Sequence, residues 1–286
     1  NLYTKIISIL KSKNEISQAI VSLENFKIQD IQKLTTRIKP SNFKTYLLNN
    51  LNNGQIEKIL IEVNLDENLK INDYKINGSV REVNIKILDN VLVEDVSFNF
   101  ISDKNLTLVN SLDAKYQNIS ISNGSVSLKR DKQIDVNGKF NSKFNLNGDT
   151  IKKLFPKLKN QFLVNNKINA QGLLLHNFSI KIDENFKLID YDYKSNGEIS
   201  ELQTILKNNF NSNFIEKPIK KLSISKTNLI INVNKNNNNL LIVEGLYNLG
   251  RNKNKKFKIS HNLNKKNPKY FIDFDLSENI FLEIIN

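Results

Sequence analysis

Cysteine is absent from this chain of 286 residues, which excludes disulfide bonds, thiolate metal sites and a cysteine nucleophile. Only two histidines occur, and His176 lies in an alternating stretch, where we expect it to face one side of a strand rather than act as a base. The sequence contains no phosphate-binding loop, no nucleophile elbow and no zinc-protease helix. We therefore expect no enzymatic activity, with no catalytic residue, no bound metal and no cofactor.

Arginine is scarce, and its scarcity affects how the charge is interpreted. The chain carries 42 basic and 29 acidic residues, a formal net charge of +13, but only four of the basic residues are arginine. Arginine is the better bidentate ligand of phosphate and guanine. Asparagine occurs 49 times, and isoleucine and lysine are also frequent, a combination that fits a genome biased toward A and T in its codons. We interpret the charge as a solvated basic surface and expect no nucleic-acid partner.

Long apolar runs and methionine are also missing. No uncharged apolar stretch approaches the roughly 20 residues of a membrane helix. Because the chain begins with asparagine and contains no methionine, we expect it to be an internal piece of a longer protein. Its 16 phenylalanines and 8 tyrosines argue against a disordered chain.

The sequence does contain strict alternation. From residue 55 to about residue 144, apolar residues recur at every second position in short runs separated by Asn, Asp, Gly and Lys, and residues 168–182 keep one parity throughout. Such runs are typical of consecutive antiparallel strands, of which we count roughly sixteen to twenty. Short helices are expected within residues 28–51, at 149–158 with Asp149 or Thr150 as the cap, and through 199–210. The expected fold is mainly β, a long antiparallel meander curved into an elongated β-groove.

Two pairs of carboxylates lie on single strand faces, Asp190 with Asp192 and Asp273 with Asp275. Paired carboxylates can bind a cation or exchange protons. Both pairs alternate with aromatic or aliphatic residues, which is typical of a strand with one solvated side. We interpret these carboxylates as outward-facing surface residues.

The parity of the alternation switches at Asn123-Gly124. Ile119 and Ile121 precede this dipeptide at odd positions, and Val126 and Leu128 follow it at even ones. Asn-Gly is the preferred centre of a two-residue type I′ turn, so we expect a hairpin that pairs Ile121 with Val126 and Ile119 with Leu128. A second loop, of odd length, is expected near Asp131.

A meander with one apolar face has to cover that face with a second sheet, by closure, or with a ligand. We expect an open groove that shelters acyl chains, each buried CH₂ contributing about 0.8 kcal/mol. The alternative is a structural or adhesive β-sandwich or solenoid with a filled core and no lipid cargo. The expected groove-lining residues are the apolar positions of the clearest strands: Ile85, Ile87, Val91, Val93, Val96, Phe98, Phe100, Ile119, Ile121, Val126, Leu128, Ile134, Val136, Phe178, Ile180 and Ile182.

An ordered series of phrases within residues 16–160 resembles one family. The series contains "AIVSLENFKIQDIQKLTTRI", "KPSNFKTYLLNNLNNGQIEKILIEV", "VLVEDVSFNF", "ISISNGSVSL" and "VNGKFNSKFNLNGDTIKKLF". In this order the phrases are similar to the central region of AsmA-like proteins, in the branch that contains YhdP and the related TamB. The strands after residue 160 fit in character only, so we divide the chain into a first β-groove segment, 1–160, and a second, 161–286, that continues the same sheet.

The resemblance implies a large periplasmic protein of a Gram-negative bacterium, anchored in the inner membrane through a segment outside this fragment. Its β-groove would conduct phospholipids between the inner and outer membranes and support the outer-membrane barrier. The implied partners are phospholipid acyl chains and the inner membrane, with outer-membrane or periplasmic partners left open. The family has no catalytic residues to transfer to this sequence.

Overall fold

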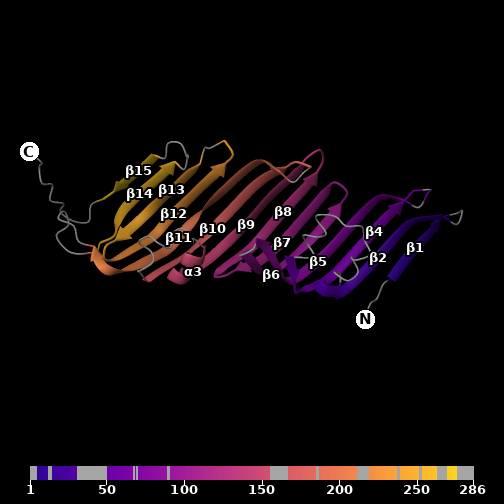
Figure 1. Ribbon diagram of the computed structural model, residues 1–286, viewed down its shortest axis with the longest axis horizontal. Helices are drawn as coiled ribbons and strands as arrows, with labels where there is room; N and C mark the ends of the chain where they lie inside the picture. Colours follow the sequence, from indigo (N-terminus) through magenta and orange to yellow (C-terminus); the bar gives the residue numbers. More distant parts are fainter. Residues whose placement is uncertain are drawn as a thin grey trace, which may run out of the picture. The chain divides into compact units, whose positions relative to one another are not determined.

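The computed structural model describes residues 5–11, 15–30, 50–66, 68, 70–88, 91–154, 167–184, 187–210, 219–236, 239–250, 253–262 and 269–275. These residues form one antiparallel sheet that is not closed into a barrel, with strands that follow one another in chain order (Figure 1). Only β3 leaves this order, because it pairs with β5. The predicted antiparallel meander is therefore confirmed.

The described residues form fifteen strands in this sheet. They are β1 (Lys5–Lys11), β2 (Glu15–Lys27), β3 (Leu51–Asn52), β4 (Gln55–Leu65), β5 (Ile71–Leu88), β6 (Val91–Asp103), β7 (Leu106–Tyr116), β8 (Ile119–Arg130), β9 (Ile134–Asn147), β10 (Lys167–Ile182), β11 (Leu188–Phe210), β12 (Ile219–Asn234), β13 (Leu240–Asn248), β14 (Lys255–Asn262) and β15 (Lys269–Phe274).

The chain divides into two compact units. The first unit comprises residues 1–116, 120–140 and 179–189, and the second comprises residues 117–119, 141–178 and 190–286. The strands β8, β9, β10 and β11 contribute residues to both.

Helical structure is sparse among the described residues. Residues 28–30 are helical, and the rest of the helical region expected up to residue 49 lies outside the described residues. The helix α3 (Gly148–Leu154) follows β9 and confirms the start of the helix expected near 149. Its cap is Asn147, whose Oδ1 accepts a hydrogen bond from the Thr150 backbone N–H at 2.9 Å, and not Asp149 or Thr150. The helix expected through 199–210 is wrong, because these residues belong to β11.

Six residues inside strands have positive φ angles, between 48° and 57°: Asn25, Glu82, Asp95, Ser111, Asn123 and Lys226. The strand register shifts where the ladder passes Glu82, Asp95, Ser111 and Lys226, as expected for β-bulges with one extra residue. An extra residue reverses the alternation, so the residues two before and one after the bulge share a face. The bulges therefore keep the apolar residues on one side along strands of unusual length.

Buried valines show this effect directly. Val80 and Val83 flank Glu82 and are 8% and 1% exposed, although their numbers differ in parity. Val93 and Val96 flank Asp95 and are 9% and 4% exposed. From the sequence alone such parity changes look like breaks between strands, although each of these strands continues through them.

The hairpin expected at Asn123-Gly124 is wrong for the same reason. Strand β8 runs through both residues without a turn, and Asn123 has a φ of 53°. Ile121 packs against the second cluster of buried side chains, and so does Leu112. A Cβ built on Gly124 would lie 2.7 Å from Leu112 Cβ, so Gly124 faces the same side as these two residues. A bulge, rather than a turn, thus joins the odd and even positions on one face. The odd-length loop near Asp131 is confirmed, because residues 131–133 connect β8 to β9.

Two similar pentapeptides close two of the hairpins, "DENLK" at 66–70 and "DENFK" at 183–187. In the first, Asp66 Oδ1 accepts a hydrogen bond from the Lys70 backbone N–H at 2.8 Å, and the Asp66 N–H donates to the Lys70 carbonyl at 2.8 Å. In the second, Asp183 and Lys187 make the same two bonds at 2.8 and 3.0 Å. The Asp side chain thus substitutes for part of the ladder where the strand ends.

Candidate functional site

The apolar face of the first unit is defined by two clusters of buried side chains. The first contains Phe26, Ile28, Ile56, Val80 and Val83, and the second contains Val93, Val96 and Ala114. Partly buried residues pack around them and extend the same face across β2–β8. Phe100 lies directly opposite Gly78, where a Cβ would lie 2.5 Å from its ring, so the ring covers the glycine.

Seven of the sixteen predicted lining residues lie on or beside this face. Val93 and Val96 are buried, and Ile85, Val91, Phe98, Phe100 and Ile121 pack against the two clusters. The others are half-buried: Ile119, Val126, Leu128, Ile134, Val136, Phe178, Ile180 and Ile182. Ile87 belongs to β5, but its side chain lies outside the described residues. Contact of these residues with lipid stays a prediction.

The second unit carries its own apolar face. In the ladder of β12–β15, Leu229 pairs with Val243, Val243 with Ile259, and Ile259 with Ile272, so one aliphatic row crosses four strands. At the last strand this face is open to solvent, where Tyr270, Ile272 and Phe274 are 64%, 60% and 50% exposed. These values show a large apolar surface that the described residues leave uncovered.

A row of polar side chains interrupts the apolar face of the second unit. Ser142 of β9, His176 of β10 and Tyr193 of β11 form this row, which we call the polar row. Ser142 Oγ lies 2.7 Å from His176 Nε2, and His176 Nδ1 lies 2.8 Å from the Tyr193 hydroxyl oxygen. The rings of His176 and Tyr193 are stacked, with centroids 6.0 Å apart. His176 therefore does lie on a strand face, as predicted, but in a buried hydrogen-bonded chain.

Burial controls the protonation of the polar row. Ser142 and His176 are 5% and 7% exposed, and burial lowers the pKa of His176, so the imidazole is neutral near pH 7. Burial also raises the pKa of the Tyr193 hydroxyl, which stays protonated. Two residues further along β11, Ser195 is 2% exposed, and its hydroxyl interacts with the Tyr193 hydroxyl, which lowers the pKa of Tyr193 by less than burial raises it.

The polar row has the spacing of a nucleophile and its base, but its surroundings differ from those of a hydrolytic site. Ser142 is almost completely buried in regular strand β9. Strand N–H groups bond to their neighbours, so a regular strand supplies no free pair of N–H groups to stabilise an oxyanion. The arrangement can donate hydrogen bonds within an apolar surface, and that is the chemistry we assign to it.

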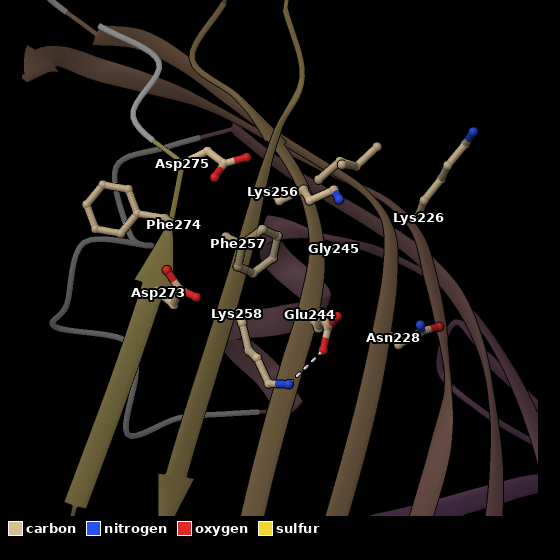
Figure 2. A pocket seen from close by; sticks show the side chains of 11 residues that line it. Lys226, Asn228, Glu244, Gly245, Lys256, Phe257, Lys258, Asp273, Phe274 and Asp275 are labelled. Carbon is tan, nitrogen blue, oxygen red and sulfur yellow. Dashed lines mark ion pairs between the residues drawn. The ribbon is translucent and has the colours of Figure 1, made fainter. Parts of the chain in front are cut away.

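The outer face of the second unit, opposite the aliphatic row, is charged. At β12–β15 a shallow depression of about 350 Å³ is lined by residues of both sheet faces: Lys226, Asn228, Glu244, Gly245, Leu246, Lys256, Phe257, Lys258, Asp273, Phe274 and Asp275. Lys258 Nζ lies 3.0 Å from Glu244 Oε2 (Figure 2). Three lysines and three carboxylates balance one another here, so the depression has no bias toward an anion. Asp273 and Asp275 lie at this outer surface, consistent with the interpretation made from their spacing.

The polar row contains two residues that sequence reasoning missed, Ser142 and Tyr193. The available signal was the parity of β10, where His176 is the one titratable residue among the even-numbered positions 168–182. A histidine in an apolar row needs hydrogen-bond partners on neighbouring strands. Identifying Ser142 and Tyr193 as these partners required the pairing register of β9, β10 and β11.

Neither a metal site nor a membrane-spanning helix is found in the described part of the chain. No group of three or more His, Cys, Asp or Glu side chains there is arranged to hold a metal ion. No described helix is long and apolar enough to cross a membrane. No family model, curated protein or solved structure matches the chain. The two apolar faces and the polar row are therefore the features of the chain that bear on its function.

Proposed function

We propose that the apolar face binds the acyl chains of phospholipids and conducts them between the inner and outer membranes of a Gram-negative bacterium, in a periplasmic protein of the AsmA-like type. The observation that carries this proposal is an open antiparallel sheet with one aliphatic face that remains partly exposed. A sandwich would need a second sheet over that face, and the described residues form one sheet only. We therefore favour a bound lipid over a filled protein core.

The energetics of burial support an acyl chain as the ligand. Each CH₂ group removed from water contributes about 0.8 kcal/mol, so a saturated chain of roughly sixteen carbons would release on the order of 10 kcal/mol in gross terms. The free energy of burying the chain on this face would then be comparable with the free energy of burying it in a bilayer. A chain can move between two such environments without a large change in free energy.

Two adjacent residues of the edge strand β15 provide a matched test. Ile272 lies in the aliphatic row, paired with Ile259, while Phe271 points to the other face, paired with Ser260. Both are 60% exposed, so a charge at either position has little effect on folding. Ile272→Glu should lower the amount of bound phospholipid, because the carboxylate would have to be desolvated against the acyl chain. Phe271→Glu should leave it unchanged.

The measurement is lipid extraction from the purified proteins followed by mass spectrometry. Wild type and Phe271→Glu should carry phospholipid above the level of an unrelated protein purified from the same cells, and Ile272→Glu should carry less. Absence of lipid from the wild type would refute the proposed function. Equal loss in both variants would refute the assignment of the faces.

A further inference from the structure

The edge strand β15 exposes apolar side chains on both of its faces. All of its residues are exposed, and Tyr270, Ile272 and Phe274 lie on the aliphatic face. Phe271 lies on the outer face and is 60% exposed as well. A lipid on the aliphatic face would cover the first three side chains but not Phe271. The proposed function therefore does not account for this exposed ring.

The backbone of β15 has a free edge in the described part of the chain. There β15 is the last strand of the sheet, paired on one side with β14. The Asp275 N–H donates to the Lys256 carbonyl at 3.0 Å, so the odd-numbered residues of β15 direct their N–H and C=O groups toward β14. The even-numbered residues, Tyr270, Ile272 and Phe274, direct theirs to the open side. Such an edge is a template for another strand.

The sequence of β15 is complementary to itself in one antiparallel register. When two copies pair about a twofold axis at Phe271, Tyr270 of one copy lies opposite Ile272 of the other. In the same register Lys269 lies opposite Asp273. Apolar side chains then meet on the aliphatic face, and opposite charges meet on the outer face, beside the two Phe271 rings. The backbone fits too, because Tyr270 and Ile272 are residues with outward N–H and C=O groups, which they would exchange as a hydrogen-bonded pair.

We propose that β15 pairs with β15 of a second copy of this chain, in an isologous antiparallel dimer centred on Phe271. The dimer would continue the sheet across two chains and cover the exposed edge. The charges favour this partner over the other terminal strand, β1, which has lysine at both ends and no carboxylate to oppose Lys269. The inference goes beyond the proposed function and does not depend on lipid binding.

Charge reversal tests the register. Asp273→Lys would place a lysine opposite Lys269 of the other copy at two symmetric positions, and should raise the dissociation constant of the dimer about tenfold or more. Lys269→Asp combined with Asp273→Lys restores opposite charges and should return the constant to within about threefold of wild type. Both variants carry the same new lysine opposite Lys258 of their own chain, so their comparison isolates the contact between copies. The measurement is sedimentation velocity of the 286-residue chain at increasing concentration.

An introduced cysteine locates the axis. The chain has no cysteine, so one substitution gives a single thiol in each copy. Phe271→Cys would form a non-hydrogen-bonded pair with Cα atoms about 4.5 Å apart, which is within the range of a disulfide. Ile272→Cys would lie opposite Tyr270, with its own counterpart two residues away at roughly 8 Å or more. Mild oxidation should therefore link Phe271→Cys into a covalent dimer about tenfold faster than Ile272→Cys.

Each outcome decides for or against this pairing. A dimer that is weakened in Asp273→Lys and restored in the double variant, with Phe271→Cys linked faster than Ile272→Cys, would support it. A monomer at every concentration would overturn it and would favour residues 276–286 of the same chain as the occupant of the edge. Growth beyond a dimer would overturn it in favour of head-to-tail contact. A dimer with the same dissociation constant in the wild type and both charge variants would overturn it too, because its interface would lie elsewhere.

Discussion

Insertion of one alanine after Asn123 tests whether the bulge holds the apolar face together. With this second extra residue, β8 can keep only one of its halves in register, so either Ile119 and Ile121 or Val126 and Leu128 turn to the solvated face. These side chains are half-buried, and each would lose about 1 kcal/mol, roughly half the value of a fully buried aliphatic side chain. We therefore expect the insertion to lower the free energy of unfolding by about 2 kcal/mol or more, whereas deletion of Asn123 should cost less, because regular alternation then keeps all four side chains on one face.

The assay is urea unfolding followed by far-ultraviolet circular dichroism. Asn123→Gly keeps the residue count and readily adopts the φ of 53°, so its stability should stay within about 0.5 kcal/mol of wild type. Insertion of an alanine after Asn236, an exposed residue between β12 and β13, controls for chain lengthening by one residue. If the insertion after Asn123 proves no more harmful than the insertion after Asn236, the register does not depend on this bulge and our explanation of the parity switch fails.

Three further predictions concern packing, pH and surface charge. Gly78→Ala should destabilise the chain, because its Cβ would lie 2.5 Å from the Phe100 ring, and Phe100→Leu should partly restore the urea midpoint. Burial lowers the pKa of His176 below its unfolded value of 6.5, so the folded state binds fewer protons and stability should fall as the pH drops below about 6.5. His176→Gln should remove that slope in urea titrations at several pH values. Lys258→Ala should cost less than about 1 kcal/mol by the same measurement, because its ion pair with Glu244 is solvent-exposed.

The regular strands were predictable from the sequence, and the bulges were not. In β10 the even positions from 168 to 182 face one side throughout, so alternation alone gives the strand and its apolar face. In β5 and β6 the positive φ angles fall on Glu82 and Asp95. Unlike glycine, these residue types do not indicate a positive φ angle in the sequence. When only the local alternation is considered, the extra residue looks like the end of one strand. The cross-strand pairing is what shows that the strand continues.

The polar row was beyond sequence reasoning for a related reason. Ser142 and Tyr193 lie 34 and 17 residues from His176, on the neighbouring strands β9 and β11. A shift of either strand by one residue would place its hydroxyl on the opposite face. Register therefore decides whether these groups meet, and register across β9–β11 cannot be read from alternation within each strand.

The contrast between aliphatic rows and the polar row has a consequence for movement along the face. A row such as Leu229, Val243, Ile259 and Ile272 offers an acyl chain similar contacts at each strand, so its free energy changes little from one strand to the next. The polar row breaks that uniformity, because it offers an acyl chain hydroxyl and imidazole groups in place of an aliphatic surface. Under the proposed function, a lipid that moves along the second unit should therefore cross the polar row more slowly than the aliphatic row. Tyr193→Phe should then speed the exchange of a bound fluorescent stearate, which stopped-flow displacement can measure, and an unchanged rate would contradict this account.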